Sequence, residues 1–184
     1  MSFVRGPTDL HRLVQSHAGI GHEPSSRAAL ELLDGSTSTW HRNEFSPGHF
    51  TASGFVASPD GTKLLLIHHA RLGRWLQPGG HIEADDLSIE DAARREVAEE
   101  TGIGLLDRKG EGIIRIDAHP IPERSDEPAH MHIDLAVGFI AGTFDIGPLD
   151  EVLDAAWVPF VDLGSFDTDD AVRRGADALR ALLT

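Results

Sequence analysis

The amino-acid sequence predicts an α/β (α+β) fold, an α/β/α sandwich around a mixed β-sheet. One strongly capped helix is expected at 89–101, with β-rich runs on both sides of it, and an amphipathic helix closes the chain after residue 167. A sheet flanked in sequence by helices has to bury both of its faces, so helical layers are expected on each side. With 184 residues and 40% hydrophobic content, the chain is long enough for one sizeable core.

Residues 1–48 are predicted to form a short N-terminal helical extension, and residues 49–184 the main domain. A first short helix would carry Leu10 and Val14 on one side. A second helix is expected from about residue 27 to 33, with Ser25 and Ser26 as N-cap candidates, because serine hydroxyls satisfy free backbone N–H groups at helix starts.

The main domain should open with a β-hairpin that spans 50–57 and 63–69, joined by the turn Ser58-Pro59-Asp60-Gly61. Three later runs also read as strands, at 112–119, 131–141 and 155–159. A last helix is expected to open at Asp167-Thr168. The segment 120–128 is too rich in proline for a strand, and its length suits a loop that covers a site.

Three glutamates gather on one face of the central predicted helix. Glu96, Glu99 and Glu100 are three or four residues apart, and residues at that spacing are neighbours on a helix surface. Each like-charged pair costs an isolated helix roughly 0.2–0.5 kcal/mol. Such a group is either left in water or holds a cation, and oxygen ligands favour Mg²⁺ or Mn²⁺.

The residues before this helix favour the cation. Gln77-Pro78-Gly79-Gly80-His81 is a loop whose glycines allow close approach of the backbone. Ser88 is the expected N-cap and Gly102 the expected left-handed C-cap, so the helix should run from about Ile89 to Thr101. Arg95 is four residues from both Asp91 and Glu99, a spacing that would pair these charges.

The Gly-Gly loop followed by Arg95-Glu-Val-Ala-Glu-Glu-Thr-Gly-Ile103 resembles the conserved box of the Nudix hydrolases. In that box a glycine is followed after five residues by glutamate, and after seven more by Arg-Glu-aliphatic-any-Glu-Glu-any-Gly-aliphatic. The second half matches in full. In the first half, Asp86 stands where the family has glutamate, and one additional residue separates it from Arg95. A loop accommodates one insertion before the helix begins.

The resemblance implies a Nudix-like α/β/α sandwich and an activity. Glu96 and Glu100 would be the principal ligands of Mg²⁺ (Mn²⁺ as an alternative), with Glu99 and the carbonyl of Gly79 as further ligands. Arg95 would orient the glutamates. The family cleaves the pyrophosphate bond of a nucleoside diphosphate linked to another moiety, such as a nucleotide, an ADP-ribose-like group or a sugar, by metal-activated water. A metal is suited to this chemistry because it neutralises phosphate charge.

The general base and the substrate contacts are less closely tied to the box. Glu151 is a candidate for the base, since some family members place an extra acidic residue similarly before a short apolar strand. Asp150 could substitute for it, and a solvated loop acid is the alternative. Arg71 and Arg74 flank the Gly-Gly loop and are candidates for binding the anionic substrate. Each of these arginines could instead be an ordinary solvated charge.

His130, His132 and Asp134 alternate along the expected strand 131–141 and therefore share a face. His132 is a candidate for lining the substrate pocket. This face could bind a second metal, or it could be a polar strand face that hydrogen-bonds to the 120–130 loop. The second interpretation is favoured, because imidazole prefers zinc and other transition metals to Mg²⁺.

Composition restricts the partners. A formal net charge of −14 argues against a nucleic-acid partner. The sequence contains no run of about 18 apolar residues, so a membrane partner is not expected either. Cysteine is absent, which excludes disulfides and cysteine nucleophiles. We expect a cytoplasmic protein whose partner is a small nucleoside diphosphate derivative; a homodimer is compatible with this. The alternative function is a non-catalytic Nudix-like nucleotide-binding or regulatory domain.

Overall fold

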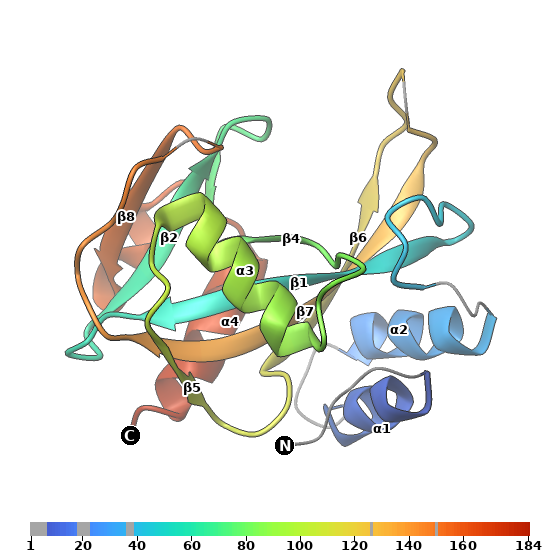
Figure 1. The fold of residues 1–184 in the computed structure, drawn as a ribbon, viewed down its shortest axis with the longest axis horizontal. Coiled ribbons are helices and arrows are strands. Elements are labelled where there is room, and N and C mark those ends of the chain that lie inside the picture. Colours follow the sequence, from blue (N-terminus) through green and yellow to red (C-terminus); the bar gives the residue numbers. More distant parts are fainter. Residues whose placement is uncertain (1–6, 18–22, 36–38, 126, 150) are drawn as a thin grey trace.

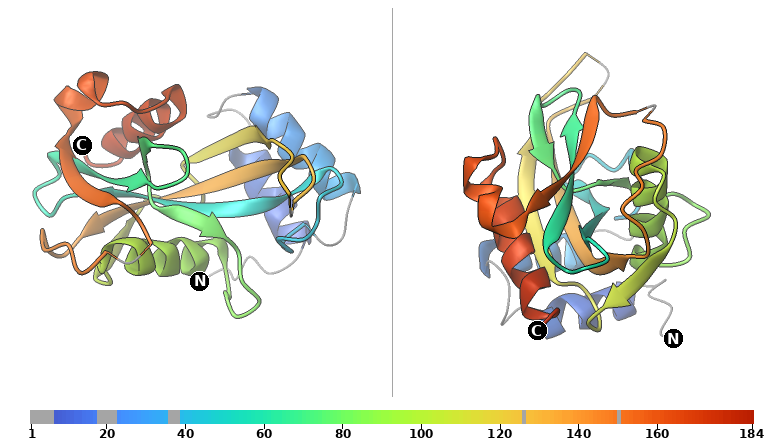
Figure 2. Two further views of the ribbon diagram at one scale, coloured as in Figure 1. Left: turned by 90° about the horizontal axis from the view of Figure 1, so that it is seen from above. Right: turned by 90° about the vertical axis from the view of Figure 1, so that its left-hand side faces the viewer.

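The computed structural model describes residues 7–17, 23–35, 39–125, 127–149 and 151–184, in which eight strands form one mixed sheet with helices on both faces (Figures 1 and 2). The helices are α1 (Pro7–His17), α2 (Glu23–Gly35), α3 (Ile89–Thr101), the 3₁₀ helix η1 (Phe160–Ser165) and α4 (Asp170–Ala181). The strands are β1 (Gly48–Ala57), β2 (Lys63–His69), β3 (Arg74–Leu76), β4 (Gly79–His81), β5 (Leu106–Lys109), β6 (Arg115–Ile121), β7 (His130–Ala141) and β8 (Asp154–Pro159).

Strand β1 is the centre of the sheet. It pairs in parallel with β7 along its whole length, and antiparallel with β2 and β4. The strand order is β3-β2-β1-β7-β5, with β8 added beside β2 and β6 beside β7. The predicted sandwich around a mixed sheet is confirmed, and β1 and β7 place residues from distant parts of the sequence next to one another.

Alternate side chains of a strand are buried on opposite faces of the sheet. Phe50 and Val56 of β1 pack in the core on the side of α1, α2 and α3, whereas Phe55 lies in the core on the side of α4. This follows from the alternation of side chains along a strand. Among the described helices, none has the length and apolar character needed to cross a bilayer.

The N-terminal helices share the core of the sheet. Leu10 and Val14 of α1 and Leu32 of α2 are buried there. The N-cap expected at Ser25 and Ser26 was wrong, because α2 already begins at Glu23. The Ser25 hydroxyl instead accepts a hydrogen bond from the backbone N–H of Ala118 at 3.0 Å, which ties α2 to β6.

Several boundaries differ from those expected. Strand β6 begins at Arg115 and includes Pro120, which lies opposite Met131 of β7. Proline is tolerated there because, among the described strands, β6 pairs with β7 alone and its other edge is left without a strand. The last helix begins at Asp170, where the side chain of Asp169 caps it by accepting a hydrogen bond from the Val172 N–H. Strands β3, β4 and β5 were not predicted, since three or four residues carry too little periodicity.

Gly175 of α4 provides a test of packing on the second face. A Cβ placed there would lie 2.1 Å from the ring of Phe55, which is fully buried. We expect Gly175→Ala to lower the free energy of unfolding by about 1–3 kcal/mol despite the better helix propensity of alanine. Chemical denaturation measures the change. Gly104→Ala is the control, because a Cβ at Gly104 meets nothing within 4 Å. Equal stabilities would contradict the assigned packing.

Candidate active site

The helix that carries the three glutamates is α3, and its bounds are those predicted. The Ser88 hydroxyl accepts a hydrogen bond from the Asp91 N–H at 3.1 Å. Gly102 adopts the left-handed conformation (φ 70°), and its N–H donates to the Ala98 carbonyl at 2.8 Å. One face of α3, which includes Val97, is buried against the sheet. Glu96 and Glu100 lie against β4, where Glu100 is buried, whereas Glu99 is exposed.

The Gly-Gly loop forms strand β4 and lies against α3. The N–H of Gly79 donates a hydrogen bond to Glu100 Oε2 at 2.9 Å. A Cβ at Gly80 would lie 2.7 Å from the carboxylate oxygens of Glu96, and a Cβ at Gly79 would lie 2.5 Å from the Cβ of Ser53. A side chain at Gly79 would therefore collide with β1, and one at Gly80 would displace the Glu96 carboxylate.

Burial and mutual repulsion disfavour the charged forms of the two inner glutamates. Only 8% of Glu100 is exposed, and its burial, together with the negative charges of Glu96 and Glu151, raises its pKa to about 8. The pKa of Glu96 is also raised, first by burial and then by Glu99 and Glu151. A site with these properties binds protons or a cation.

Arg95 joins the members of this site. Its Nη1 atom donates to Glu96 Oε1 and to Glu99 Oε2, each at 2.9 Å, and its Nη2 atom donates to the carbonyl of His81 at 2.8 Å. The predicted pairing with Glu99 is confirmed. The pairing expected with Asp91 was wrong, because Asp91 accepts a hydrogen bond from the Ser88 hydroxyl at the start of the helix.

Asp86 occupies the remaining side of the Arg95 guanidinium. Its two oxygens accept hydrogen bonds from Arg95 Nε and Nη2 at 3.1 and 2.9 Å. Asp86 Oδ2 also accepts from the N–H of Glu83 at 2.8 Å, and this bond closes the turn 83–86. The shorter acid therefore contacts the arginine despite the insertion.

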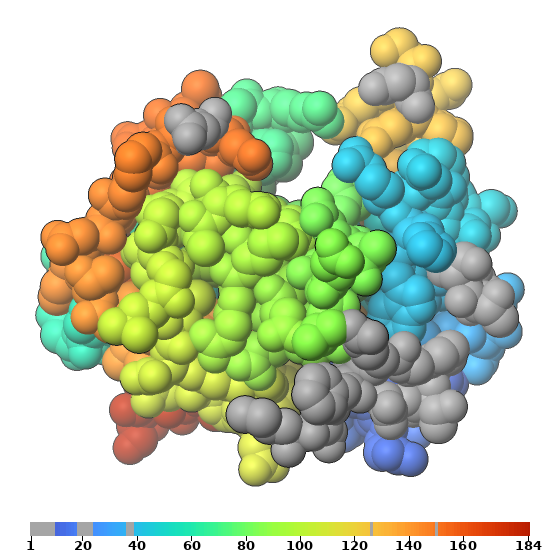
Figure 3. Space-filling model, in the orientation of Figure 1, coloured from blue at the N-terminus to red at the C-terminus, as the bar shows by residue number. Residues whose placement is uncertain are grey.

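Of the other predicted site residues, Glu151 lies near this centre, and Asp150 is outside the described residues. Glu151 is exposed, and it is close enough to raise the pKa of Glu96 and of Glu100. Arg71 is exposed in the turn between β2 and β3, and Arg74 Nε lies 3.9 Å from Asp167 Oδ1. The space-filling view shows a notch on the upper edge of the molecule, between this turn and the loop that joins β6 to β7 (Figure 3).

A cavity of about 300 Å³ lies beside Asp86. It is lined by Trp40, Ile82 and Asp86, among others. The indole of Trp40 packs at 6.4 Å from the ring of Phe50. The cavity thus borders Asp86 and includes an indole ring that a nucleobase could contact.

His132 lies on a different face from the glutamates, within a group of histidine rings. The rings of His49, His81 and His130 have their centroids 4.6, 5.3 and 4.9 Å from that of His132. Asp134 shares this face as expected, and it accepts hydrogen bonds from the hydroxyls of Thr51 and Ser53. The sequence pattern identified His130 and His132 but not His49, because only the pairing of β1 with β7 brings it there.

Comparison with known proteins agrees with this geometry. The NUDIX domain family model matches residues 48–181. The uncharacterized Nudix hydrolase YvcI of Bacillus subtilis (strain 168) is 39% identical over 51 residues, which is 28% of this chain. That match spans only 32% of the length of the Bacillus protein.

Two solved structures are similar in fold. A NUDIX-family hydrolase from Clostridium perfringens has a TM-score of 0.57 and 26% identity, with 74% of this chain and 98% of that chain covered. The NUDIX domain of Shewanella oneidensis NrtR, in complex with ADP ribose, has a TM-score of 0.56 and 19% identity, with 73% and 88% covered. Since the family model spans most of the chain and includes both α3 and β4, this protein belongs to the Nudix family.

Proposed function

We propose that this protein is a Mg²⁺-dependent hydrolase that cleaves the pyrophosphate bond of a nucleoside diphosphate linked to another moiety. The observation that carries the proposal is the burial of Glu96 and Glu100 together beside the Gly79-Gly80 backbone. Such a site has little structural benefit without a cation. Membership of the Nudix family supports the reaction class, and the ADP-ribose complex of the similar NrtR domain supports the substrate class.

The donor atoms fit Mg²⁺, with Mn²⁺ as the alternative. The proposed ligands are carboxylate oxygens of Glu96, Glu99 and Glu100 together with the carbonyl oxygen of Gly79, and hard divalent cations prefer oxygen ligands. The hydrogen bond from the Gly79 N–H to Glu100 holds this peptide beside the carboxylates. When bound, Mg²⁺ supplies neutralisation of the diphosphate charge and activation of the attacking water.

The remaining residues orient groups and move the proton. Arg95 is a positioning residue, because its guanidinium fixes the rotamers of Glu96 and Glu99. We assign Glu151 as the general base that accepts a proton while the water oxygen bonds to phosphorus and the bond to the bridging oxygen breaks. Arg71 and Arg74 are proposed to bind the outer phosphate or ribose groups of the substrate. For His132 we propose a different role below.

A screen of diphosphates in the presence of Mg²⁺ tests the function directly. Nucleoside triphosphates, ADP-ribose, nucleotide sugars and dinucleoside polyphosphates would be incubated with the protein, and released phosphate would be measured with and without a coupled phosphatase. We expect turnover of at least one class, abolished by a chelator. Saturable binding of a substrate without turnover would favour the non-catalytic nucleotide-binding function.

Substitution of Asp86 should lower kcat less than substitution of Glu96. We expect Glu96→Gln to lower kcat by at least about 100-fold, because it removes a proposed metal ligand, and Asp86→Asn to lower it by about tenfold, the range seen for outer-shell partners. Arg95 keeps its bonds to Glu99 and to the His81 carbonyl after Asp86→Asn. Steady-state rates at saturating Mg²⁺ measure both effects. The reverse order would show that Asp86 takes part directly.

A further inference from the structure

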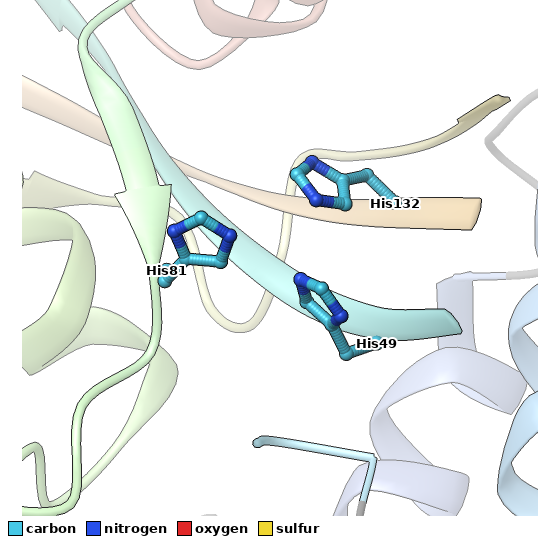
Figure 4. Close-up of side chains that lie close together, drawn as sticks. All are labelled: His49, His81 and His132. Carbon is cyan, nitrogen blue, oxygen red and sulfur yellow. The ribbon is translucent and has the colours of Figure 1, made fainter. Parts of the chain in front are cut away.

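Three histidines from distant parts of the chain meet on one face of the sheet. His49 of β1 lies opposite His132 in the parallel pairing with β7, and His81 of β4 lies opposite Thr51, two residues after His49. Since side chains two residues apart point to the same face of a strand, the three imidazoles converge. The close-up shows the rings directed toward a common space between β1, β4 and β7 (Figure 4).

The distances are short enough for one ion. One ring nitrogen from each of the three histidines lies within 4.8 Å of the other two, and the ring centroids are 4.6–5.3 Å apart. Two nitrogens bound to a tetrahedral Zn²⁺ are about 3.4 Å apart, given bonds of about 2.0–2.1 Å. Small rotations of the side chains about their χ angles would therefore bring the nitrogens to bonding distance.

His49 has the arrangement of a metal ligand. The residue is 1% exposed, and its Nδ1 atom lies 2.9 Å from the carbonyl of Glu44. A carbonyl only accepts hydrogen bonds, so Nδ1 carries the proton and Nε2 offers a lone pair. Nε2 is buried and has no hydrogen-bond partner among the described residues. A bond from the second ring nitrogen to a carbonyl is the usual way of orienting a metal-bound histidine.

The imidazoles are held in the form that binds metals. Burial lowers the pKa of His49 and lowers that of His132 to about 2, and the neighbouring rings lower both further. These shifts favour the neutral form of both rings. Only the neutral imidazole coordinates a metal, so binding would displace no proton from these rings.

We propose that His49, His81 and His132 form a site for a transition-metal ion of the Zn²⁺ type. Nitrogen ligands select such ions over Mg²⁺. Three imidazoles leave a fourth position for water or another ligand. His130 stacks on His49 with a centroid distance of 5.0 Å and an interplanar angle of 25°, and it supports the orientation of that ring.

This site is separate from the glutamate cluster. Gly80 faces the carboxylate of Glu96, and the next residue, His81, points to the opposite side of β4. The backbone of β4 therefore lies between the two groups of ligands. The nitrogen site and the oxygen site should bind different metals, and neither proposal depends on the other.

Zinc titration of the whole chain tests the proposal. In the Glu96→Gln/Glu100→Gln background, which weakens the oxygen site, competition with a chromophoric chelator should still show one Zn²⁺ per chain. His81→Gln or His132→Gln in the same background should weaken that binding by at least about tenfold, because loss of even an outer-shell partner costs about 10–100-fold. His68→Gln, which removes a histidine from β2 outside the cluster, is the matched control and should leave the affinity unchanged.

The electron paramagnetic resonance spectrum of bound Cu²⁺ gives an independent measurement. Hyperfine coupling to imidazole nitrogen is expected in the double-glutamine background and should be lost in His132→Gln. Circular dichroism of each variant establishes that it is folded. If the folded background protein binds no Zn²⁺, or if the two histidine variants bind it as tightly as the His68→Gln control, the proposal is overturned.

Discussion

Glu100→Gln is expected to lower Mg²⁺-dependent phosphate release by at least about 100-fold while the protein remains folded. The change removes a proposed ligand charge at nearly constant volume. The glutamine amide oxygen can still accept the hydrogen bond that Gly79 now donates to Glu100. Initial rates with the substrate found in the screen, at several Mg²⁺ concentrations, measure the effect. Full activity in this variant would refute the assignment of Glu100 as a metal ligand.

Although Glu100→Gln should lower activity, it should raise the free energy of unfolding when no metal is present. The pKa of Glu100 is raised from an ordinary 4.5 to about 8, so the folded chain holds this proton more tightly than the unfolded chain. The contribution of Glu100 to the free energy of unfolding is fully present below about pH 4.5 and is lost as the pH rises to about 8. In a chelator at about pH 8, Glu100→Gln should therefore be more stable than the wild type by on the order of 1 kcal/mol or more.

Denaturation in urea at about pH 5 and pH 8 measures this difference. The gain of the variant over the wild type should be small at the lower pH and grow toward the higher one. Saturating Mg²⁺ should reverse the order at pH 8, because a ligand that binds only the folded wild type stabilises it by mass action. A difference that does not change with pH would contradict the raised pKa.

Deletion of residues 1–47 is expected to leave a chain that is largely unfolded. The deletion removes Leu10, Val14 and Leu32 from the core, and burial of each such side chain contributes about 1.5–3 kcal/mol. The sum is comparable to the whole stability of a typical domain, about 5–15 kcal/mol. Circular dichroism and urea denaturation of residues 48–184 measure the outcome. Unchanged stability would show that the extension and the 49–184 domain fold independently, as the predicted division implies.

Point variants separate lost packing from the effects of truncation. Leu32→Ala in α2 should cost about 2–5 kcal/mol, the range for a buried leucine. Glu31→Ala in the same helix is the matched control, because Glu31 is exposed and alanine has a good helix propensity. Equal losses in the two variants would contradict the role of α2 in the shared core.

Local sequence was sufficient to predict α3 and its glutamates. The Ser88 and Gly102 caps, the pairing of Arg95 with Glu99, and the glycines at 79 and 80 depend on contacts within a few residues or within one family motif. The strands from 48 to 69 and from 130 to 141 were also predicted, because β-branched and apolar residues recur over long runs there. Strand β4 was not predicted, since its three residues are held in place by β1.

The sequence by itself predicted the acidic helix, its bounds and the membership of this chain in the Nudix family. These features depend on i to i+4 spacing, capping and motif spacing, which are properties of neighbouring residues. Tertiary structure alone decided which residues meet across the sheet. The register of β1 with β7 and β4 brings His49, His132 and His81 together, and the turn at Glu83 brings Asp86 to Arg95. Strand register is set by the packing of the whole sheet, so no local pattern could have predicted these contacts.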